Sequence, residues 1–193
     1  MTKNYPVEFS ISAGACIWWC LLILLAPLNL VFTFSIAAAI HEFCHLLALY
    51  LFRVPVFSIS LGISGAMIQT APLHPKQEFF CAAAGPLGSF LCILLFRIFP
   101  LIALCGFIQG IYNLLPLYPM DGGRMLHCFC LYRCPNHASM ICKTAKITTI
   151  ALISGFCMFL YLRTWDRLYL LIALYFLLQT CIKRKIPCKE HRY

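Results

Sequence analysis

The sequence predicts an all-α membrane protein with about six transmembrane helices and a short β-hairpin or loop between the second and the third. Of its 193 residues, 62% are hydrophobic and 11% are charged, whereas soluble domains average about 45–50% and about 25%. Apolar runs recur along the chain, and one stretch between two of them alternates apolar with small polar residues. The length indicates a single domain, residues 1–193.

Six apolar runs are candidates for the transmembrane helices. They cover roughly residues 11–26, 28–52, 79–96, 98–119, 147–162 and 168–182. Because a bilayer core of about 30 Å needs about 20 apolar residues, the first, fifth and sixth runs are marginal in length and could thin the bilayer locally. Pro27 closes the first run, and the turn after it is so short that the first two helices should form a hairpin.

The positive charges orient these helices. If the N-terminus is cytoplasmic, only Arg97, Arg163 and Arg167 fall on the opposite side, which leaves twelve of the 15 Lys and Arg residues in cytoplasmic segments. This asymmetry follows the positive-inside rule, so we expect a multi-pass protein of the cell membrane with both termini cytoplasmic. The basic tail, residues 183–193, is then a cytoplasmic stop-transfer segment. A net charge of +9 can also indicate nucleic-acid binding, but no stripe of Lys and Arg alternates with aromatic residues, so we expect lipid and no nucleic acid as partner.

The stretch between the second and third runs differs from a helix. Residues 58–64 alternate apolar and small polar side chains, and Gly65 follows. This period of two predicts a short hairpin, although a simple surface loop is the alternative. A hairpin would keep its backbone paired at membrane depth, and its free edge could accept an extended peptide as an added strand.

The second run contains an H-E-x-x-H motif: His41, Glu42 and His45. Ionisable side chains at membrane depth are costly, so three of them within five residues indicate a function. On a helix the two histidines lie four residues apart on one face. That face could bind one metal ion, with the carboxylate of Glu42 beside it.

A catalytic zinc ion usually has three protein ligands and one open position, so a third ligand is needed. The acidic residues besides Glu42 are Glu8, Glu78, Asp121, Asp166 and Glu190. By the predicted topology, only Asp121 lies at the depth of the histidines, at the cytoplasmic end of the fourth run. Pro116 and Pro119 should interrupt the helix before it, and an interrupted helix is tolerated where it lines a cavity. An ordinary Asp-Gly turn is the alternative for Asp121.

These motifs resemble the site-2 protease family of intramembrane zinc metalloproteases. The resemblance rests on H-E-x-x-H in one run, on N-x-x-P-x-x-P-x-D-G-G from Asn113 to Gly123 in a later one, and on A-G-P-L-G-S at residues 84–89, which ends in Ser89 where the family usually has Asn. The six-run layout is most similar to the sporulation stage IV factor B branch, without the CBS domain common there. The resemblance covers about residues 28–124, the expected catalytic core, and leaves 147–182 as accessory spans.

The resemblance implies a zinc metalloendopeptidase that binds Zn²⁺ through His41, His45 and Asp121. Glu42 would be the general base, and Asn113 would bind the substrate backbone. The expected substrate is a membrane-associated protein cut near the cytoplasmic face, such as a sigma-factor precursor or another transcription regulator, with regulatory membrane partners. The chemistry of the residues agrees, because zinc activates water and a neighbouring carboxylate can take its proton.

The polar residues allow two other interpretations. A divalent-metal transporter would also place imidazoles and carboxylates in membrane spans, but transport should need polar sites at successive depths, and here they gather at one depth. A second cluster of thiols and imidazoles could bind zinc or an iron–sulfur centre; it comprises His127, Cys128, Cys130, Cys134, His137 and Cys142. Because it contains no C-x-x-C pair, we favour a Cys-rich cytoplasmic loop.

Overall fold

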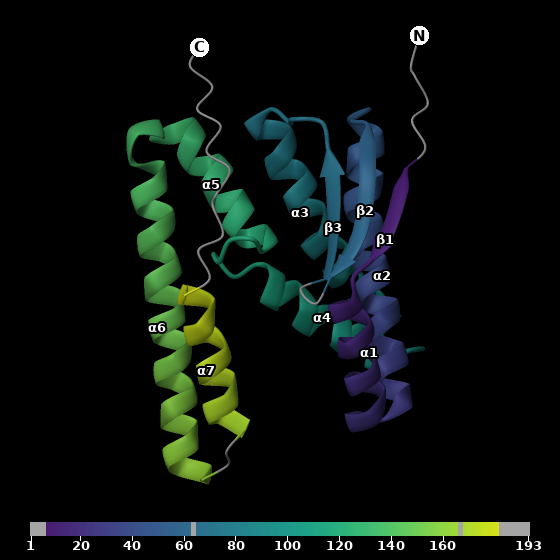
Figure 1. Ribbon diagram of the computed structural model, residues 1–193, viewed down its shortest axis with the longest axis vertical. Coiled ribbons are helices and arrows are strands. Elements are labelled where there is room, and N and C mark those ends of the chain that lie inside the picture. Colours follow the sequence, from purple (N-terminus) through teal and green to yellow (C-terminus); the bar gives the residue numbers. More distant parts are fainter. Residues whose placement is uncertain (1–6, 63–64, 166–167, 182–193) are drawn as a thin grey trace. The chain divides into compact units, whose positions relative to one another are not determined.

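Helix α2 (Leu28–Leu51) is the central element of the N-terminal half of the protein. In the computed structural model, which describes residues 7–62, 65–165 and 168–181, the chain forms two compact units with the boundary between Leu114 and Leu115. The first unit contains β1 (Glu8–Ile11), α1 (Ala13–Leu25), α2, β2 (Val56–Gly62), β3 (Gly65–Thr70), α3 (Pro75–Leu91), the short 3₁₀ helix η1 (Cys92–Leu95) and α4 (Pro100–Asn113) (Figure 1).

Helices α2, α3 and α4 pack against one another and form the core of this unit. Their contacts are made by small residues, of which Ala37, Ala82 and Ala103 are at most 2% exposed. Small side chains let helix backbones approach closely, which is the usual way to pack helices in a membrane. The exposed surface of the unit is apolar instead: Leu24 and Leu25 on α1 and Leu94 on η1 are 78%, 80% and 79% exposed.

Local signals set the ends of these helices. The Ser12 side chain accepts a hydrogen bond from Ala15 N at 3.1 Å and caps the start of α1, as N-cap serines do. His74 and Gln77 form a reciprocal capping box at the start of α3. The fourth apolar run extends to residue 119, but its helix α4 ends at Asn113, ahead of the interruption that the sequence predicts at Pro116 and Pro119. The prolines at 116 and 119 explain the early end, since proline cannot continue the backbone hydrogen bonds of a helix.

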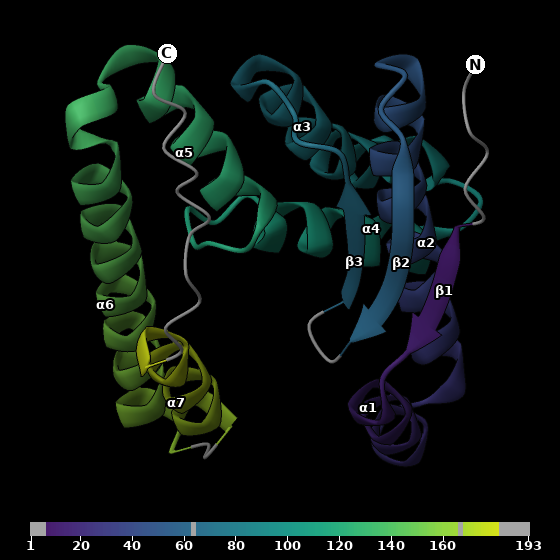
Figure 2. The same cartoon turned by 45° about the horizontal axis from the view of Figure 1, so that its top comes forward.

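The predicted hairpin is present, and it belongs to a three-stranded sheet of order β1-β2-β3. Strands β2 and β3 are antiparallel, with Ile59 opposite Ile68; Ile63 and Ser64, between them, lie outside the described residues. The fold is therefore helical with a small sheet rather than all-α. Strand β1 was not expected, because Ile11 was assigned to the first apolar run; it pairs with β2 in parallel. Parallel strands need a crossover connection, and α1 with α2 provides it (Figures 1 and 2).

The second unit consists of α5 (Asp121–Arg133), the 3₁₀ turn η2 (Pro135–His137), α6 (Ala138–Thr164) and α7 (Leu168–Cys181). Helix α6 packs against both α5 and α7. The last two apolar runs correspond to α6 and α7, but α6 begins earlier than the run suggested; residue 182 and the basic tail lie outside the described residues.

Within the residues that the structure describes, three helical segments are long and apolar enough to cross a membrane: Leu28–Leu51, Pro75–Leu95 and Pro135–Thr164. Ala13–Leu25 and Pro100–Asn113 are shorter apolar helices. A core of about 20 apolar residues spans a bilayer, so these segments indicate a membrane protein.

Candidate metal centre

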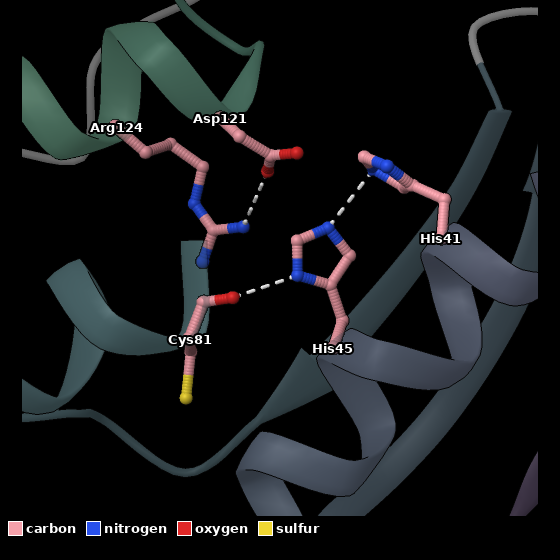
Figure 3. A network of polar contacts seen from close by, with 5 residues as sticks. All are labelled: His41, His45, Cys81, Asp121 and Arg124. Carbon is pink, nitrogen blue, oxygen red and sulfur yellow. Dashed lines mark hydrogen bonds and ion pairs between the residues drawn. The ribbon is translucent and has the colours of Figure 1, made fainter. Parts of the chain in front are cut away.

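His41 and His45 lie one turn apart on α2, and both imidazoles point to the same side of the helix (Figure 3). They are 3% and 8% exposed, whereas histidine is usually only partly buried. The ring centroids are 4.8 Å apart and the rings meet edge to face at 85°. The two Nε2 atoms approach to 3.2 Å, so the H-E-x-x-H motif forms a convergent pair of nitrogen donors, as its spacing predicted.

Helix α3 holds the other nitrogen of each ring. Nδ1 of His45 lies 2.7 Å from the backbone carbonyl oxygen of Cys81, and Nδ1 of His41 lies 2.8 Å from Oγ of Ser89. A carbonyl oxygen can only accept, so the hydrogen of neutral His45 is on Nδ1 and its Nε2 presents a lone pair. Metal-binding histidines nearly always engage their second nitrogen in this way.

Gly85 lies on α3 between these two contacts. A Cβ atom at this position would overlap the His45 ring and lie 2.7 Å from Nε2 of His41. Glycine is therefore required here for the rings to occupy the space beside α3. Cys81, Gly85 and Ser89 are spaced by four residues and lie in one row along α3. This row contains the Cys81 carbonyl group, the space left by the missing side chain of Gly85, and the Ser89 hydroxyl group.

The geometry of the two rings fits a zinc ion. Two nitrogens at about 2.0–2.1 Å from one tetrahedral Zn²⁺ are about 3.3 Å apart, which is close to the observed separation of 3.2 Å. Both Nδ1 atoms contact α3, so a metal would be bound through the two Nε2 atoms. The donor set of this unit thus suits a divalent ion that prefers imidazole.

Glu42 and Asn113 belong to the same unit. Glu42 is half-buried on α2, next to His41 in the sequence. Asn113 is the last residue of α4 and is also half-buried. Within the part of the chain that the structure describes, no hydrogen bond joins Asn113 to either imidazole, so its role in substrate binding stays a prediction.

Asp121 belongs to the second unit, where it is the first residue of α5 and 6% exposed. Arg124, one turn later, places Nη1 3.6 Å from its Oδ1 (Figure 3). A carboxylate at a helix N-terminus is stabilised by the helix dipole. Gly123 keeps the turn tight, because a Cβ there would lie 2.8 Å from the Leu117 carbonyl oxygen. The N-x-x-P-x-x-P-x-D-G-G motif therefore ends one helix and buries a carboxylate at the start of the next.

The row on α3 was not predicted from the sequence. The A-G-P-L-G-S segment shows only a resemblance, and nothing in one sequence indicates that its glycine and serine face the histidines. The second cysteine and histidine cluster is spread over α5, η2 and α6, and Cys128 and Cys130 are 3% and 4% exposed. Among the described residues, no group of three potential metal ligands includes a member of that cluster.

The fold is similar to that of a solved structure, the site-2 protease from Methanocaldococcus jannaschii. The similarity has a TM-score of 0.60 and covers 93% of this chain and 91% of that chain, at 18% sequence identity. At this identity the comparison establishes a shared fold. No protein-family model and no curated protein sequence matches the chain.

Proposed function

We propose that this protein is an intramembrane zinc metalloendopeptidase of the site-2 protease type. The observation that carries the proposal is the 3.2 Å approach of the two Nε2 atoms on an apolar helix long enough to span a membrane. The shared fold with a site-2 protease supports it independently of the motif. The two histidines are buried, their Nε2 atoms converge, and both Nδ1 atoms have hydrogen-bond partners. Such an arrangement in a membrane-spanning helix favours a metal site over a purely structural role.

Asp121 is the proposed third ligand. Its carboxylate is buried, as the two imidazoles are, and carboxylate oxygens are common ligands of zinc. Two imidazoles and one carboxylate are a known ligand set of catalytic zinc, and they leave the fourth position open. In this proposal both compact units contribute to one functional domain.

When bound, Zn²⁺ would lower the pKa of a water molecule to about 7 and polarise the scissile carbonyl. Glu42 is the proposed general base, since it sits beside the first ligand on α2. Its carboxylate would take a proton from the attacking water and return it to the leaving amine. Asn113, at the end of α4, would hold the substrate backbone.

The proposed substrate is a membrane-associated protein that is cut near the cytoplasmic face. An intact helix hides its amide groups in hydrogen bonds, so the substrate needs a weak or helix-breaking segment at the cleavage site. Strand β3 is at the edge of the sheet, and an edge strand can bind an unwound segment by adding it as a further strand. A sigma-factor precursor, as in the sporulation branch, or another transcription regulator would fit this class.

The topology that we propose has six spans and both termini in the cytoplasm. The three long helices, the two shorter apolar helices α1 and α4, and α7 would supply these spans. In this arrangement α2 and α4 run in the same direction, which brings the ends that carry the histidines and Asn113 to the cytoplasmic half.

Glu42→Gln tests the mechanism. The substrate would be a membrane-anchored reporter whose transmembrane segment contains a helix-breaking residue near its cytoplasmic end. Loss of a general base typically costs about 10²–10⁴-fold in rate, so we expect cleavage to fall by at least about 100-fold while zinc stays bound. Glu78→Gln, which removes the same charge at the start of α3, is the control. Full activity of Glu42→Gln would contradict the mechanism, and metal uptake into proteoliposomes would favour a transporter.

A further inference from the structure

We infer that Ser89 is a positioning residue for the metal centre, and that its hydroxyl holds His41 in either of the two tautomers that the ring needs. This inference rests on the proposed zinc site. It concerns a residue that takes no part in binding the metal itself and lies on a different helix from the histidines.

The two imidazoles are supported unequally. His45 is held by the backbone carbonyl of Cys81 at 2.7 Å, which can accept a hydrogen bond but cannot donate one. His41 is held by the Ser89 hydroxyl at 2.8 Å, which can do both by rotation about its C–O bond. His45 is therefore fixed in one tautomer, whereas His41 is free to hold its hydrogen on either nitrogen.

The separation of 3.2 Å between the Nε2 atoms suits two arrangements of hydrogen. In the first, Nε2–H of His41 donates to Nε2 of His45, and Nδ1 of His41 accepts from the Ser89 hydroxyl. In the second, both Nε2 atoms bind the metal, the hydrogen of His41 is on Nδ1, and Oγ of Ser89 accepts it. The two arrangements differ only in which ring nitrogen of His41 holds its one hydrogen. Only a group that both donates and accepts can support the ring throughout.

Ser89 is shielded from solvent. The residue is 0% exposed, and α4 covers α3 at this point, because a Cβ on Gly106 would lie 2.8 Å from the Ser89 carbonyl oxygen. Water cannot readily replace the hydroxyl in such a site. Removing it would leave Nδ1 of His41 buried and without its partner, and the ring would no longer be held at the angle that aims Nε2 at the metal.

The experiment compares full-length wild type with Ser89→Ala, Ser89→Thr and Ser154→Ala in detergent. Zn²⁺ affinity is measured by chelator competition, and the visible spectrum of the Co²⁺-loaded protein reports the ligand geometry. Ser154 is the matched control: it is also a helical serine with a buried Oγ, and that atom has no hydrogen-bond partner among the described residues.

We expect Ser89→Ala to bind Zn²⁺ about 10–100-fold more weakly, the range for loss of an outer hydrogen-bond partner, with a changed Co²⁺ spectrum. Ser154→Ala should match wild type, and Ser89→Thr, which keeps the hydroxyl, should bind within about threefold of it on the same basis. Ser89→Ala with wild-type affinity and spectrum would overturn the inference but not the zinc site. Equal weakening by Ala and Thr would also overturn it, because side-chain volume would then be the cause. If wild type itself bound no metal, the proposed function would fall, and the role of Ser89 with it.

Discussion

The Cys81 carbonyl oxygen lies 2.7 Å from Nδ1 of His45, so the orientation of this ring depends on the backbone path of α3 and not on a side chain. The H-E-x-x-H motif on α2 supplies the imidazoles, but it does not fix where they point. Their direction comes from a second helix, which offers a carbonyl, a gap and a hydroxyl at intervals of four residues. Several measurements can test this division of roles.

Gly85→Ala should weaken Zn²⁺ binding by about tenfold or more, comparable to the loss of an outer-shell contact. The added methyl group would overlap the His45 ring and crowd Nε2 of His41, so both rings would have to move. Chelator competition measures the affinity, and circular dichroism checks that the helices are retained. Gly155→Ala on α6 is the control, because a Cβ there meets nothing within 4 Å. Wild-type affinity in Gly85→Ala would contradict the geometry described for the two rings.

If Asp121 is the third ligand, as proposed, Asp121→Asn should reduce Zn²⁺ affinity by at least about 100-fold, since losing a ligand should exceed the 10–100-fold effect of losing an outer-shell partner. The substitution keeps the size of the side chain and removes its charge. Metal content of the purified protein, measured beside wild type and the Glu78→Gln control, decides the outcome. About one zinc per chain in both wild type and Asp121→Asn, with equal affinity, would exclude this carboxylate as a ligand.

Zinc should raise the thermal stability of the wild-type protein. A ligand present at 100 times its Kd and bound only by the folded state adds about 2.7 kcal/mol to the free energy of unfolding. The midpoint of thermal unfolding, followed in detergent with and without Zn²⁺, measures this effect. His45→Ala removes one donor of the pair and should abolish the shift. The same shift in both proteins would mean that zinc binds elsewhere.

The proposed topology predicts which side of the membrane two positions occupy. Cys134, an exposed residue after α5, should react with an impermeant maleimide only from the cytoplasmic side. Thr164→Cys, at the end of α6, should react only from the opposite side in a Cys134→Ser background. Both experiments need Cys188→Ser as well, since the tail is also predicted to be cytoplasmic. Labelling of both positions from one side would refute the proposed orientation of α6.

The parts of the site that the sequence predicted are those with a local signature. Two histidines four residues apart share one face of a helix, independent of the neighbouring elements. Alternation of apolar and polar residues around Ser60 likewise favours a strand, independent of the strand with which it pairs. The structure shows both the convergent rings and the hairpin.

The parts that were missed depend on contacts between distant segments. The pairing of β1 with β2 joins Glu8 to Ser58, and a four-residue strand has too short a pattern to be recognised alone. Ser89 and Gly85 matter only because α3 packs on α2, which periodicity does not reveal.

The crossover from β1 to β2 ties the sheet to the helix that carries both imidazoles. Only residues 52–55 separate the end of α2 from β2, and each residue of extended chain reaches about 3.5 Å at most. Part of this link is folded back on the helix, since Val54 N donates to the Leu49 carbonyl oxygen at 3.0 Å. A displacement of β2 along its axis is therefore passed through this short link to the last turns of α2. The position of His45 is thus coupled directly to the position of the sheet.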